Sequence, residues 1–77
     1  MKTTAYFRYT RNRPDRARIT DEWIDQTVQA PVAEAVQADG RIRRWGYIAS
    51  EGRYLRVILL PDQETVHNAF FDRSFKP

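Results

Sequence analysis

The 77-residue chain carries 13 Lys and Arg residues against 10 Asp and Glu, giving a formal net charge of +3, and it contains no cysteine. A chain this short forms one domain, residues 1–77, with a single core, and the missing cysteines exclude a disulfide frame and a thiolate metal site. No apolar run approaches the roughly 20 residues of a membrane span and the first ten residues lack an apolar signal core, so we expect a soluble, cytoplasmic protein without a membrane partner.

The N-terminal segment has two parts. Residues 5–10, AYFRYT, alternate loosely between apolar and polar side chains, which predicts a short strand. Residues 11–18, RNRPDRAR, are polar and interrupted by Pro14, which predicts a loop.

The clearest helix signal covers residues 20–30. Thr20 is a suitable N-cap because its hydroxyl can accept a hydrogen bond from the first turn, and Asp21 and Glu22 place negative charge at the helix N-terminus. Pro31 disfavours the helical conformation at the preceding residue and should end the helix.

From residue 32 onward the apolar period changes from near four residues to two. Three turn signals separate the alternating segments, at Asp39-Gly40, Ser50–Gly52 and Pro61–Glu64. Asp-Gly between two alternating segments is a strong hairpin signal. Together with the early strand, these segments predict an α+β fold in which one main helix packs on a four- to five-stranded antiparallel meander.

Because side chains alternate across a strand, the predicted strands sort their residues onto two faces. The face that should take the helix is almost wholly apolar and collects Ile42, Gly46, Ile48, Leu55, Val57, Leu59, Val66 and Phe70. The opposite face collects Arg43, Trp45, Tyr47, Tyr54, Arg56, Ile58 and His67. We expect the second hairpin to place Tyr47 opposite Tyr54 and Trp45 opposite Arg56.

The lone histidine, His67, should lie near Ile58 and point away from the core. A hydrogen-bonded structural histidine is the simplest interpretation, and an acid or base near neutral pH is the functional one. Asn68 should fall on the core side, where a buried amide would bind the backbone.

The polar face supports two interpretations. Arginines can hold phosphates, aromatic rings can stack on bases, and a histidine can exchange a proton, which together favour an RNA site. Alternatively, Trp45, Tyr47 and Tyr54 form a second small core under the Arg-rich N-terminal segment, with arginines extended over them. One histidine with scattered carboxylates gives no metal-ligand spacing, and no nucleophile or phosphate-binding glycine loop is present, so we expect no metal and no cofactor.

Charge is distributed unevenly along the chain. Residues 1–18 carry +5, residues 19–40 carry −5 and residues 41–77 carry +3, and 11 of the 13 basic side chains are arginine. The planar arginine fork suits bidentate phosphate contacts. RNA or an acidic protein is therefore an expected partner, and a surface of ordinary ion pairs is the alternative.

Four motifs in order, RPDRARIT-EWI, DGRIRRWGYI, GRYLRVILL and TVHNAFFDRSF, carry a resemblance over residues 7–76. They resemble a family of small uncharacterised bacterial proteins of about this length. More distantly, the order of elements is similar to the RelE and BrnT group of toxin ribonucleases, which implies a RelE-like build and metal-independent RNA cleavage.

The resemblance also implies roles for individual residues. Arg43 and Arg56 would hold the phosphate, and His67 would serve as acid or base. Trp45, Tyr47 and Tyr54 would stack on or orient the RNA, with Tyr54 also a candidate catalytic residue, and Arg11 and Arg13 would add RNA contacts.

Two functional hypotheses follow. The first is a RelE-like protein that binds and cleaves RNA and is held in check by a small acidic, antitoxin-like companion. The second is a non-enzymatic interaction module that docks an acidic partner on its basic face, or forms a homodimer through an open sheet edge.

Overall fold

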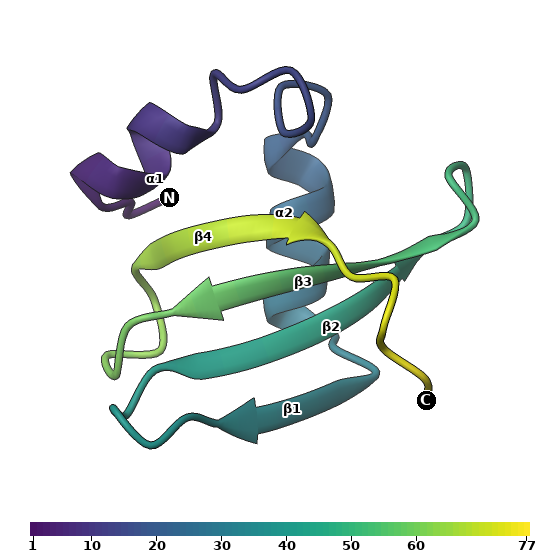
Figure 1. The fold of residues 1–77 in the computed structure, drawn as a ribbon. Helices are drawn as coiled ribbons and strands as arrows, with labels where there is room; N and C mark the ends of the chain where they lie inside the picture. The colour runs from purple at the N-terminus through teal and green to yellow at the C-terminus, as the bar shows by residue number, and fades with distance from the viewer.

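The fold is described from a computed structural model that covers residues 1–77 (Figure 1). Two helices, α1 (Ala5–Thr10) and α2 (Asp21–Gln29), are followed by four strands, β1 (Ala33–Val36), β2 (Ile42–Ile48), β3 (Arg53–Leu59) and β4 (Val66–Phe71). The strands form one antiparallel meander in the order β1-β2-β3-β4. Figure 1 shows α2 crossing one face of the sheet and α1 lying beside β4. The predicted α+β class and the antiparallel meander are confirmed.

Helix α2 begins and ends where the sequence predicts. The Thr20 hydroxyl accepts a hydrogen bond from the backbone N–H of Trp23 at 3.1 Å, and Ala30, just before Pro31, is the C-cap. Ile24 on α2 is buried against the sheet. The core consists of Phe7, Ile19, Ile24, Ile42, Ile48, Leu55, Val57, Leu59, Val66 and Ala69.

The prediction of a strand at residues 5–10 is wrong, because these residues form helix α1. The Thr4 hydroxyl caps the helix by accepting a hydrogen bond from the Phe7 N–H, and Phe7 and Thr10, three residues apart, are buried on one side of it. A spacing of three residues places two side chains on the same helix face, so AYFRYT fits a helical turn as well as a loose alternation. The extended pairing occurs just before α1, where Thr3 forms an isolated parallel bridge with Val66.

The hairpin that joins β2 and β3 has the predicted register. Tyr47 lies opposite Tyr54 and Trp45 lies opposite Arg56. The turn glycine Gly52 has a φ of 64°, a left-handed conformation that favours glycine.

Helix α2 lies close to the sheet at Gly46 on β2. A Cβ atom added there would lie 2.5 Å from Oγ1 of Thr27, whose hydroxyl donates a hydrogen bond to the Trp23 carbonyl. The absence of a side chain at Gly46 therefore allows α2 to lie directly on β2.

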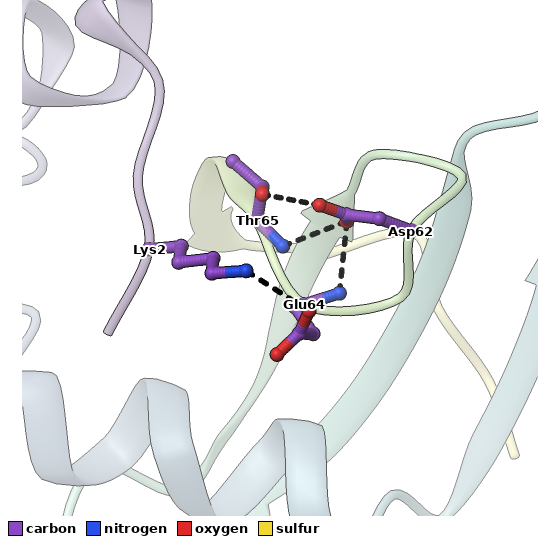
Figure 2. Close-up of polar contacts among 4 residues, drawn as sticks. All are labelled: Lys2, Asp62, Glu64 and Thr65. Atoms are coloured by element: carbon purple, nitrogen blue, oxygen red, sulfur yellow. Dashed lines mark hydrogen bonds and ion pairs between the residues drawn. The ribbon is translucent and has the colours of Figure 1, made fainter.

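The third hairpin turns through Asp62, as Figure 2 shows. Its carboxylate accepts hydrogen bonds from the backbone N–H groups of Glu64 and Thr65 and from the Thr65 hydroxyl, which together lower the pKa of Asp62 to about 2. Lys2 forms an ion pair with Glu64 at 3.2 Å, which connects the N-terminal segment to this turn (Figure 2).

Strand β4 contains a bulge that changes the predicted faces. Leu59 pairs with Val66 but Ile58 pairs with Asn68, so His67 is the extra residue and has no partner on β3. After the bulge, Asn68 and Phe70 lie on the face away from α2, whereas Ala69 is buried in the core. The expectations that Asn68 and Phe70 face the core are wrong, because one inserted residue exchanges the two faces of a strand.

Neither helix has the length and apolar composition needed to cross a membrane.

Candidate functional site

The sheet face opposite α2, which we call the outer face, carries five of the candidate residues. They are Arg43, Trp45 and Tyr47 on β2 and Tyr54 and Arg56 on β3. The observed register of β2 and β3 brings these side chains together as predicted.

Trp45 is the most enclosed ring of the outer face, with only 8% of its surface exposed. The ring of Phe75 stacks on it with centroids 4.7 Å apart, and its Nε1 donates a hydrogen bond to Asp72 at 3.0 Å. The C-terminal residues therefore cover a second small core. The alternative prediction of such a core is right for Trp45, but its cover is the C-terminal segment and not the N-terminal one.

Arg56 is also engaged by the C-terminal segment. Its Nη1 forms an ion pair with Asp72 at 3.3 Å, and its guanidinium lies over the rings of Trp45 and Phe70. Burial would raise the pKa of the Asp72 carboxyl, but hydrogen bonds from Trp45 and Ser74 and the charge of Arg56 together lower it to about 2. Asp72 is therefore ionised at neutral pH and offsets the charge of Arg56.

The two tyrosines extend the aromatic surface toward solvent. Tyr47 and Tyr54 lie with ring centroids 5.0 Å apart, and Tyr54 also contacts Phe75 at 5.1 Å. Tyr47 is 47% exposed, so a ligand can reach part of its side chain.

Arg43 differs from its neighbours in having no partner within the protein. It forms none of the eight ion pairs of the structure, and its buried Nε has no hydrogen-bond acceptor. The Nε atoms of Arg16 and Arg56 also lack an acceptor, but both of these guanidinium groups form ion pairs. An anion placed beside Arg43 would neutralise the one charge of the outer face that has no carboxylate partner.

His67 lies on the edge strand β4, apart from the contacts that Asp72 makes with Trp45 and Arg56. Its Nδ1 is 3.1 Å from the Thr4 hydroxyl oxygen, and its ring stacks on Tyr6 with centroids 4.9 Å apart. Burial lowers the pKa of His67, and the charge of Arg41 lowers it further. The imidazole is therefore neutral at pH 7.

The N-terminal arginines have separate positions. Arg11 forms an ion pair with Asp21 and lies over the Phe7 ring, whereas Arg13 is exposed and forms no ion pair. The arginine that reaches the outer face is Arg16, which donates a hydrogen bond to the Asn68 side chain at 2.6 Å.

Sequence reasoning missed Arg16, Asp72 and Phe75 as parts of the outer face. Periodicity does not place a loop residue or a C-terminal segment that has no regular structure. The spacing of an acid and an aromatic ring in FDRSF was the one available signal, since Asp72 and Phe75 both contact Trp45.

The structure contains no group of three or more His, Asp or Glu side chains that could hold a metal ion. No family model, curated protein or solved structure matches this chain. The resemblance to the RelE and BrnT group stays a prediction, and the geometry of the outer face is the basis for a functional proposal.

Proposed function

We propose that this protein binds RNA on its outer face. The observation that carries the proposal is Arg43, a cation within the sheet that forms no ion pair within the protein. A phosphate would neutralise this charge. Tyr47, four residues further along β2, offers an exposed ring on the same face for a base to stack on.

The distribution of ion pairs supports an anionic ligand. The eight ion pairs engage eight of the 13 basic side chains. The five without a carboxylate partner are Arg8, Arg13, Arg43, Arg73 and Lys76. Only Arg43 among them lies within the sheet, next to aromatic rings. This combination favours a nucleic acid, because an acidic peptide would use the charge but not the rings.

The binding test compares two arginine variants that lose the same charge. Arg43→Ala should weaken binding of a short mixed-sequence RNA several-fold and reduce the salt slope by about 0.7, the contribution of one phosphate contact on a single strand. Arg18→Ala should leave both unchanged, since Arg18 is an exposed side chain paired with Glu51. Fluorescence anisotropy at several salt concentrations measures both quantities. Equal effects of the two variants would contradict the assignment to Arg43.

RNA cleavage is the second candidate function, and His67 supports it. The lowered pKa keeps the imidazole neutral, and in the tautomer in which Nδ1 donates to the Thr4 hydroxyl, Nε2 has a free lone pair. In a RelE- or BrnT-like reaction this nitrogen would accept the proton of a ribose 2′-hydroxyl, while Arg56 or Arg43 stabilises the phosphate charge.

A metal-free cleavage assay tests this second function. His67→Gln should reduce cleavage of a labelled RNA by about 100-fold or more while changing RNA affinity only a few-fold, because a neutral side chain contributes little to phosphate attraction. Cleavage that persists in His67→Gln would rule out this residue. A wild-type protein that binds but does not cleave would limit the function to binding.

A further inference from the structure

The two edge strands of the sheet differ in whether another segment of the chain pairs with them. On the outer side of β4, the Val66 N–H donates to the Lys2 carbonyl at 2.8 Å and the Thr4 N–H donates to the Val66 carbonyl at 3.1 Å. Helix α1 continues along the same edge, as Figure 1 shows. Strand β1 forms the opposite edge and pairs only with β2, so its other side is open.

The hydrogen-bonding pattern identifies the free backbone groups of β1. The Gln37 N–H donates to the Arg41 carbonyl, so residue 37 and, by alternation, Ala33 and Ala35 point toward β2. The N–H and C=O groups of Glu34 and Val36 therefore point outward. They form a regular template for one more strand.

Strand β1 lacks the features that usually prevent such pairing. It has no lysine, no proline and no bulge, and its one charge, Glu34, is paired with Arg44 at 3.2 Å. Val36 and the preceding Val32 are 70% and 57% exposed. Two of the most exposed large apolar residues thus lie at this open edge of the sheet.

We propose that β1 pairs antiparallel with β1 of a second copy of this chain, about a two-fold axis at Ala35. In this register Glu34 lies opposite Val36 of the second copy, and the outward groups of both residues form hydrogen-bonded pairs. A two-fold axis at Glu34 would place two carboxylates directly opposite each other, which is unfavourable. A second copy suits this edge because each strand contributes the same small side chains and no unneutralised charge.

This pairing would also join the outer faces of the two copies. Arg43 lies opposite Ala35 in the β1–β2 ladder, so the two Arg43 residues would flank the two-fold axis on the same side of one continuous sheet. Their Cα atoms would be about 15 Å apart, the sum of three strand spacings. The dimer itself does not depend on RNA binding, but it would give RNA two equivalent phosphate contacts.

A single-cysteine experiment tests the register, because the chain has no cysteine of its own. Under mild oxidation Ala35→Cys should form a covalent dimer, since the two residues 35 are directly opposite each other. Ala33→Cys, the same change on the same face, should remain uncrosslinked because the two residues 33 would be separated by about four residues, or 13 Å, along the strand. No crosslink at residue 35, or an equal crosslink at residue 33, would overturn the proposal.

Sedimentation measures the association without any crosslink. The unmodified protein should sediment as a concentration-dependent dimer, and Val36→Lys should weaken dimerisation at least tenfold by placing a charge at the open edge. Tyr9→Lys is the matched control, because it also replaces an exposed apolar residue but lies on α1. A monomeric wild-type protein, or equal effects of the two variants, would refute the dimer. Neither experiment contains RNA, so its failure leaves the RNA-binding proposal untouched.

Discussion

At the scale of single residues, Asp72 organises the covered part of the outer face. One carboxylate oxygen accepts from Trp45 Nε1 and lies 3.3 Å from Arg56 Nη1, while the other accepts from the Ser74 N–H and hydroxyl. Phe75 follows three residues later and stacks on Trp45. One acidic side chain therefore holds the C-terminal segment on the sheet and neutralises Arg56.

Replacing Asp72 should destabilise the protein in a pH-dependent way. The folded pKa of about 2 lies below the ordinary value of 3.8, so the ionised carboxylate stabilises the fold fully above about pH 4, and this contribution is lost as the pH falls toward 2. Asp72→Asn should lower the free energy of unfolding by about 1–3 kcal/mol at pH 7. Urea titrations monitored by tryptophan fluorescence measure the free energy of unfolding. The difference between Asp72→Asn and the wild-type protein should shrink at low pH.

Asp25→Asn is the control for this measurement, because Asp25 is an exposed helix residue without an ion pair. It removes the same charge and should change stability by less than about 0.5 kcal/mol. Similar losses for both variants would show that the contacts of Asp72 contribute nothing specific.

At the scale of elements, α2 and the first two hairpins could be predicted because local signals decide them. Thr20 and Pro31 bound the helix, and the turn before Gly52 fixes the register that brings Trp45 opposite Arg56. Residues 5–10 were mispredicted because a six-residue segment with apolar side chains three apart fits either period. Tertiary packing of Phe7 against the core selects the helix.

The bulge at His67 was the other failure at this scale. Val66 and Ala69 both reach the core only if one residue between them is skipped in the ladder. A sequence pattern of period two has no means to show such an insertion, and every residue after it changes face. Asn68 and Phe70 were therefore assigned to the wrong side.

The contact between α2 and β2 gives a prediction at the element scale. Gly46→Ala would place a Cβ 2.5 Å from Thr27 Oγ1, so α2 must shift, and the free energy of unfolding should fall by about 1–3 kcal/mol. Thermal or urea unfolding measures the loss. Combining Gly46→Ala with Thr27→Ala should recover part of it, because the second change removes the obstructing atoms.

Gly52→Ala is the comparison for Gly46→Ala. Nothing lies within 4 Å of an added Cβ at Gly52, so the cost there is only backbone strain at a φ of 64°, about 1 kcal/mol. If the double variant with Thr27→Ala recovered none of the loss at Gly46, the close approach of α2 would not be its cause.

At the scale of the whole molecule, the sheet separates packing from recognition. One face takes α2 and the core, and the outer face keeps Arg43 and Tyr47 available while the C-terminal segment covers Trp45. The sequence predicted which side chains of β2 and β3 share the outer face. It did not predict which of them remain free, because that depends on the position of Phe75, a residue outside any strand.

The most direct test is an amide-shift NMR titration of the protein with a short mixed-sequence RNA at low salt, repeated at higher salt. We predict shifts centred on Arg43, Tyr47 and Tyr54 that fade as salt rises, because phosphate contacts release counterions. Trp45 and Arg56 should shift less, since Asp72 and Phe75 hold them. No shifts on the outer face at low salt would contradict RNA binding.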